Sequence, residues 1–165
     1  MAHTLTGGQK DLGGGKINSQ WVPVHSNTLL VGEDIAADEL GNLSNPDKVA
    51  NPDNLKFSEK MRTLFIGEDS GSHVNNFLWA YNVDTKRLSR LMSMPAGAEA
   101  TGLHVVDDLN GWTYIMSNFQ HAGDWSAVHA KVQPSLDPLI RANYKDRHGA
   151  AVGYLTADLT GIKLS

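Results

Sequence analysis

The chain has 165 residues, 41% of them hydrophobic, and a formal net charge of -4. This length suits a single domain with its own core, and the weak negative charge argues against a nucleic-acid partner, which normally selects a basic surface. The absence of cysteine excludes disulfides, thiolate metal ligands and cysteine nucleophiles.

Residues 1–20 are rich in glycine and poor in apolar side chains, and we expect this segment to be flexible. It lacks the apolar centre of a secretory signal peptide. The Gly15-Lys16 pair does not indicate a phosphate-binding loop, because Lys10 and Ile17 replace the glycine and the hydroxyl residue that this motif needs. No apolar run in the chain approaches the ~18–20 residues that cross a membrane, so we expect no membrane partner.

Residues 21–165 are expected to form one β-rich domain. Its middle part predicts four short strands joined by tight turns, within residues 55–57, 63–66, 77–83 and 88–92. Four short consecutive strands are the plan of a propeller blade. The strand pattern partly recurs about 50 residues later, within residues 103–106 and 112–116, and this period is typical of propeller blades.

Two stretches predict short helical insertions in the β-rich domain. The first is Asp34–Leu40, closed by Gly41. The second is capped by Ser135 and has Pro138 in its first turn. Residues 150–156 predict a last strand.

Polar clusters stand at the ends of the predicted strands, where a propeller directs side chains toward its central channel. The residues in these clusters are Asp53, Asn54, Glu68, Asp69 and Glu99. Their carboxylate and amide oxygens are hard ligands that suit calcium, magnesium or ferric iron. The same sequences also suit turns and solvated loop tips. His121 follows a strong strand and can be either a functional residue or a histidine that is hydrogen-bonded within a loop.

Five motifs in this order resemble the PhoX-type alkaline phosphatases, over roughly residues 45–156. They occupy residues 51–57, 64–71, 77–83, 99–102 and 119–125. The resemblance implies a six-bladed β-propeller and a phosphomonoesterase with a calcium and iron cluster in its channel. It also implies a periplasmic or secreted location, because members of this family are usually exported.

The resemblance implies metal-binding roles for the five acidic and amide residues of the polar clusters, which are Asp53, Asn54, Glu68, Asp69 and Glu99. It makes His121 a motif position, which we assign to substrate binding. The family's iron site uses a cysteine, so the resemblance implies an iron site that this chain leaves incomplete.

The chain is long enough for about three blades, since each blade takes about 40–50 residues, so together with the resemblance it is expected to form a partial six-bladed β-propeller. We therefore expect the C-terminal portion of such a phosphatase, with little activity as an isolated chain. The expected partners are a phosphate monoester and either the missing blades or a second copy. Two alternatives fit the same residues: a calcium-dependent lactone hydrolase of the propeller type, and a non-catalytic propeller fragment that acts as an assembly module.

Overall fold

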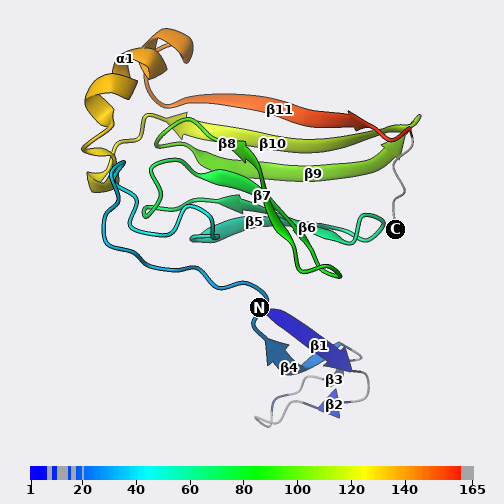
Figure 1. Ribbon diagram of the computed structural model, residues 1–165. Coiled ribbons are helices and arrows are strands. Elements are labelled where there is room, and N and C mark those ends of the chain that lie inside the picture. Colours follow the sequence, from blue (N-terminus) through cyan, green and yellow to red (C-terminus); the bar gives the residue numbers. More distant parts are fainter. Residues whose placement is uncertain (7–8, 11–14, 16–17, 20, 161–165) are drawn as a thin grey trace. The chain divides into compact units, whose positions relative to one another are not determined.

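The computed structural model describes residues 1–6, 9–10, 15, 18–19 and 21–160 (Figure 1). The chain divides into two compact units, Met1–Val31 and Gly32–Ser165. Within the described part of the chain, no helix has the length and apolar character needed to cross a membrane.

The first unit consists of two antiparallel strand pairs. Strand β1 (Ala2–Thr6) pairs with β4 (Val22–Asn27), and the short strand β2 (Gln9–Lys10) pairs with β3 (Asn18–Ser19). The other residues of the segment expected to be flexible lie outside the described residues, apart from Met1 and Gly15.

The second unit contains two antiparallel sheets, which confirms the expectation of a mainly β fold. The first sheet has the order β5 (Pro52–Ser58), β6 (Thr63–Glu68), β7 (Phe77–Asn82) and β8 (Leu88–Ser93). The second sheet has the order β11 (Gly149–Asp158), β10 (Trp112–Ala122) and β9 (Glu99–Leu109). A 3-10 turn (Ala127–His129) and the helix α1 (Gln133–Asn143) connect β10 to β11.

The strands form where apolar, β-branched and aromatic side chains were found in the sequence, but β9 and β10 are longer than predicted. Backbone pairing continues beyond the apolar stretches, because β10 has a hydrogen-bonding neighbour on each side. As a result, Glu99 begins β9 and His121 lies near the end of β10. Both residues therefore sit on paired strands, whose positions the sheet determines.

The predicted helix at Asp34–Leu40 is wrong, because this segment is irregular and contains an isolated β-bridge from Asp34 to Ser44. The Asp38 carboxylate accepts hydrogen bonds from the backbone nitrogens of Leu40, Gly41 and Asn42, at 2.9, 2.7 and 2.8 Å. A side chain that satisfies these nitrogens offers the backbone an alternative to helical hydrogen bonds.

The second predicted helix is present as α1, but Ser135 does not cap it. Ser135 lies inside the first turn, and its hydroxyl donates a hydrogen bond to the Val132 carbonyl at 2.9 Å. The residue at the N-cap position is Val132, and Pro134 follows in the first turn, whereas Pro138, which was expected there, lies inside the helix. Proline fits in the first turn because that turn leaves its backbone nitrogens without helical partners.

The two sheets of the second unit pack against each other, with β9 next to β5 and β6 (Figure 1). Gly67 of β6 makes a close approach possible, because a Cβ atom there would lie 2.4 Å from the backbone oxygen of Ala100 in β9. Fully buried alanines and Leu78 continue the contact in a core cluster, which Ile140 of α1 joins. Small residues thus bring the ends of β6 and β9 close together.

His129 links the connection between β10 and β11 to the rest of the second unit. Its Nδ1 accepts a hydrogen bond from the Ser126 nitrogen at 3.0 Å, and its Nε2 donates one to the Val74 carbonyl at 3.1 Å. This pattern requires a neutral ring. Burial is the largest cause that lowers the pKa of His129 below its ordinary value.

We expect acid to destabilise the protein through His129. The unfolded chain binds a proton at this histidine below about pH 6.5, whereas the folded chain resists protonation there, so this contribution to stability falls as the pH falls below 6.5. Each unit by which folding lowers the pKa corresponds to about 1.4 kcal/mol. Urea unfolding of the wild type and of His129→Gln at pH 8 and pH 5.5 measures the effect. The stability difference between the two proteins should shrink at the lower pH, and an unchanged difference would contradict the prediction.

Candidate metal centre

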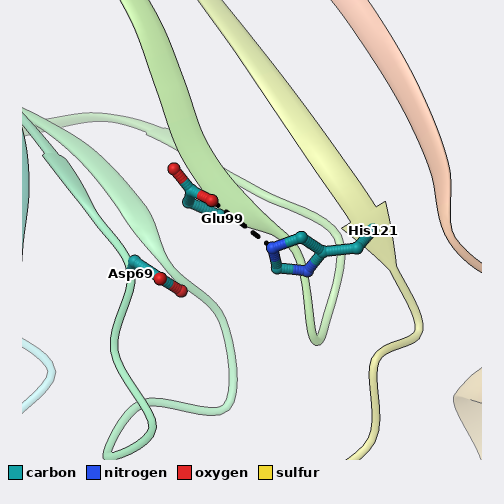
Figure 2. A group of neighbouring side chains, drawn as sticks. All are labelled: Asp69, Glu99 and His121. Carbon is teal, nitrogen blue, oxygen red and sulfur yellow. Dashed lines mark hydrogen bonds and ion pairs between the residues drawn. The ribbon is translucent and has the colours of Figure 1, made fainter.

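Three side chains, two on strands and one directly after a third strand, converge at the junction of the two sheets. Asp69 directly follows β6, Glu99 begins β9, and His121 lies near the end of β10. One possible ligand atom from each residue lies within 4.8 Å of the other two (Figure 2). Figure 2 shows the Asp69 carboxylate on one side of this group, and Glu99 and His121 in contact on the other. Two carboxylates and one imidazole are therefore held at a spacing that a single metal ion can bridge.

Glu99 is the buried member of the group, with 7% of its surface exposed. Its Oε2 accepts a hydrogen bond from the Gln120 amide and lies 3.4 Å from His121 Nε2. Its Oε1 lies 3.4 Å from the Asn54 amide nitrogen. Both oxygens are thus held by neighbours, and the carboxylate has a defined orientation.

A bulge in β10 explains how two consecutive residues reach the same carboxylate. Neighbouring side chains on a regular strand point to opposite faces, yet both Gln120 and His121 contact Glu99. The pairing of β10 with β11 shifts register between Phe119 and Ala122, and His121 has a φ of 47°. Bulges redirect side chains in this way and are common next to functional sites. A positive φ is also uncommon for residues other than glycine.

The backbone around Gly97 orients the His121 ring. The Gly97 carbonyl lies 3.0 Å from His121 Nδ1, so a proton on Nδ1 is donated to this carbonyl and Nε2 is left to bind a metal. Gly97 has a φ of 74°, and a Cβ atom there would lie 2.7 Å from the backbone oxygen of Asp124. Only glycine fits this close approach without strain.

The electrostatics of the group favour a cation. Partial burial raises the pKa of the Asp69 carboxyl group above its ordinary value, and the negative charge of Glu99 raises it further. Asp53 and Asp124 add to this effect, whereas His121 opposes it. Four carboxylates therefore act on a small region with one histidine among them, and a bound cation would offset their repulsion.

The donor set fits iron or another first-row metal. Imidazole suits iron and zinc, and carboxylate oxygen suits both these metals and calcium. Calcium takes six to eight oxygen ligands, so it would need more than the two carboxylates of the group. Asp53 and Asp124 are additional oxygen donors whose charges act on Asp69.

Of the other predicted site residues, some lie beside the group of three and one lies away from it. Asn54 lies at the margin of the group, where its amide nitrogen donates to Asp53 Oδ2 at 2.7 Å and also approaches Glu99. Glu68 lies apart from the group, although it directly precedes Asp69. It is the last residue of β6, whereas Asp69 is the first residue after the strand.

Glu68 instead joins the core, where it is fully buried. Its Oε1 accepts hydrogen bonds from the Ala50 nitrogen at 2.8 Å and from Trp79 Nε1 at 2.7 Å. Its Oε2 accepts one from the Phe77 nitrogen and faces His73 Nδ1, both at 3.1 Å. Four partners around one carboxylate satisfy its hydrogen-bonding capacity, so Glu68 connects three segments of the chain.

Sequence reasoning missed Gln120, Gly97 and Asp124. Gln120 and Asp124 both lie in the motif that contains His121, so proximity in sequence was an available signal. Gln120 lies opposite Glu99 in the register of β10 and β9, a pairing between distant segments that no local pattern predicts. The role of Gly97 depends on a backbone approach between two loops far apart in the sequence.

No model of a known protein family matches the chain, and no curated protein or solved structure matches it. The geometry of the metal centre and the motifs in the sequence are therefore the features that support a function.

Proposed function

We propose that this chain supplies cation ligands to a metal-dependent phosphomonoesterase and forms a C-terminal portion of its β-propeller. The observation that carries this proposal is the convergence of Asp69, Glu99 and His121 within 4.8 Å. Each of the three comes from a different motif of the resemblance to the PhoX-type phosphatases, at residues 64–71, 99–102 and 119–125. Three motifs spread over more than 50 residues thus contribute one side chain each to a single site.

The arrangement of the strands supports the propeller part of the proposal. Strands β5 to β8 form a four-stranded antiparallel sheet in sequence order, as in a propeller blade. A second antiparallel sheet packs on it, with β9 next to β5 and β6. The proposal includes about three blades of a six-bladed ring and the periplasmic or secreted location that the resemblance implies.

The residues of the site have separate tasks in this proposal. A bound metal would hold phosphate oxygens and neutralise the charge that develops during hydrolysis. Asp69, Glu99 and His121 would bind it, while Gln120 and Asn54 keep the Glu99 carboxylate in position. Iron fits the histidine, and calcium would also draw on Asp53, whose carboxylate is held by Asn54.

Cation binding by named variants tests the proposal. We expect Asp69→Asn and Glu99→Gln each to weaken Mn²⁺ or Ca²⁺ binding at least about 100-fold in isothermal titration calorimetry, because even outer-shell changes at metal sites cost about 10–100-fold. Glu39→Gln is the matched control, since Glu39 is an exposed carboxylate outside the site. Equal affinities in all four proteins, or no binding by the wild type, would exclude this metal centre.

The reaction is tested with p-nitrophenyl phosphate in the presence of calcium and iron. We expect little turnover by the isolated chain, because it forms only part of the proposed ring and lacks the cysteine of the family's iron site. Robust turnover would show that the chain is a sufficient enzyme. A lactone assayed in parallel tests the hydrolase alternative, which the same carboxylates could serve with a single calcium ion.

An assembly role remains the second candidate, because the sheet of β9, β10 and β11 exposes apolar side chains. Val152 and Tyr154 of β11 are 77% and 62% exposed, and Trp112 of β10 is 43% exposed. Exposed apolar surface of this kind often marks a protein interface. Light scattering with and without cation separates the candidates, since a pure assembly module forms the same oligomer in both conditions.

A further inference from the structure

Lys56 lies between two contacts that connect β5 to β9. On one side, the Asn54 amide approaches Glu99; on the other, the Ser58 hydroxyl donates a hydrogen bond to Asp107. Alternate residues of a strand share one face, so Lys56 lies on the same face of β5 as Asn54 and Ser58. This face is turned toward β9 and therefore toward the candidate metal centre at the start of β9.

Within the described part of the chain, the ammonium group of Lys56 has no partner. Lys56 is half-buried, yet of the residues that the structure describes none forms a hydrogen bond or an ion pair with its side chain. The more exposed Lys48 and Lys60 both pair with carboxylates, at 2.9 and 3.5 Å. A lysine can cover its methylene stem while its ammonium group stays accessible, so the half-buried Lys56 keeps a charge that a ligand can reach.

The distance along β5 brings Lys56 within reach of a ligand at the metal centre. Lys56 is two residues from Asn54, which corresponds to about 7 Å of strand. The lysine side chain is flexible and four methylene groups long, so its ammonium group can approach a molecule bound beside Glu99. The carboxylates of the site repel an anion, so an anion would bind there only together with a cation.

We propose that Lys56 binds the oxyanion of the substrate, a phosphate group that is held at the same time by the cation at Asp69, Glu99 and His121. This inference rests on the proposed function, and it assigns the substrate side of the site to a residue of β5. Lysine is a common partner of phosphate in proteins because its charge is compact and its position adjustable.

Binding of inorganic phosphate to the cation-loaded chain tests this role. We expect Lys56→Met to weaken phosphate binding roughly tenfold or more in calorimetry at saturating Mn²⁺, since a charge-assisted hydrogen bond is lost. Lys56→Met should bind Mn²⁺ as tightly as the wild type or more tightly, because a positive charge near the metal has been removed. Lys56→Arg should restore most of the phosphate affinity. Lys60→Met is the matched control and should bind phosphate like the wild type.

The outcomes separate this inference from the proposed function. If Mn²⁺ binds to the wild type but phosphate affinity is the same in Lys56→Met, the role of Lys56 is excluded and the metal centre stands. If the Mn²⁺-loaded wild type does not bind phosphate, the role is excluded as well. If the wild type does not bind Mn²⁺, the proposed function fails, and the inference fails with it. A parallel loss of phosphate and Mn²⁺ binding in Lys56→Met would indicate damage to the fold and would also count against the role.

Discussion

Glu68→Ala is expected to remove most of the stability of the second unit. The substitution leaves four buried groups without an acceptor: two backbone nitrogens, the Trp79 indole and the His73 ring. Each buried donor that loses its partner costs about 1–3 kcal/mol. The total approaches the whole stability of a typical domain, which is about 5–15 kcal/mol.

Chemical unfolding followed by tryptophan fluorescence measures this effect, because Trp79 contacts Glu68 directly. Glu59→Ala is the control, since Glu59 is exposed at the neighbouring turn. Should Glu68→Ala not fold, Glu68→Gln provides a second measurement. The glutamine oxygen still accepts hydrogen bonds in place of one carboxylate oxygen, but the glutamine NH₂ group faces other donors. The Glu68→Gln protein should therefore be destabilised, but less than the Glu68→Ala protein. Near wild-type stability of both variants would contradict the role of Glu68 in the core.

Gly67→Ala is expected to separate the two sheets and to weaken cation binding. The added Cβ atom would lie 2.4 Å from the Ala100 oxygen and 3.2 Å from the Ala100 carbon. These are backbone atoms of a fully buried residue, so they cannot move aside as a flexible side chain could. Forcing extra volume into a packed core costs about 1–3 kcal/mol.

The substitution should also weaken cation binding, because Gly67 and Ala100 are close in sequence to Asp69 and Glu99. A displacement of β6 from β9 increases the distance between the two carboxylates, and we expect roughly tenfold weaker Mn²⁺ binding or more. Gly71→Ala is the matched control, since a Cβ atom at Gly71 would meet no atom within 4 Å. Calorimetry and urea unfolding should both distinguish the two variants. Equal behaviour would show that the sheets can move apart without affecting the site.

The sequence predicted the strands of the second unit, and the three clustered residues are among the six candidate site residues that it indicated. Strands such as Phe77–Asn82 have a strong local signal, because aromatic and apolar side chains favour a pleated surface. The cluster was predictable in part, since Asp69 and Glu99 stand where strands begin or end. His121, which was predicted to bind substrate, has a ring nitrogen within 4.8 Å of the Asp69 and Glu99 carboxylates.

The remaining features depend on contacts between distant segments. The different positions of Glu68 and Asp69 follow from the end of β6, which the sequence alone does not define to a single residue. The bulge at His121 arises from pairing with β11, about 30 residues further along the chain. The predicted helix at Asp34–Leu40 failed because the Asp38 side chain takes the backbone hydrogen bonds that a helix would need.

Glu68 and Asp69 are neighbours in the chain, and one is fixed in the core while the other faces the metal centre. Because one peptide unit joins them, a local unfolding of the core around Glu68 also displaces Asp69 from the site. A ligand that holds Asp69 in place in turn disfavours that unfolding. Occupancy of the site and the folding equilibrium are therefore thermodynamically coupled. A ligand that binds only the folded state adds RT ln(1 + [L]/Kd) to its stability. The melting temperature of the chain can thus report on its ligands even where no catalytic turnover is available as a signal.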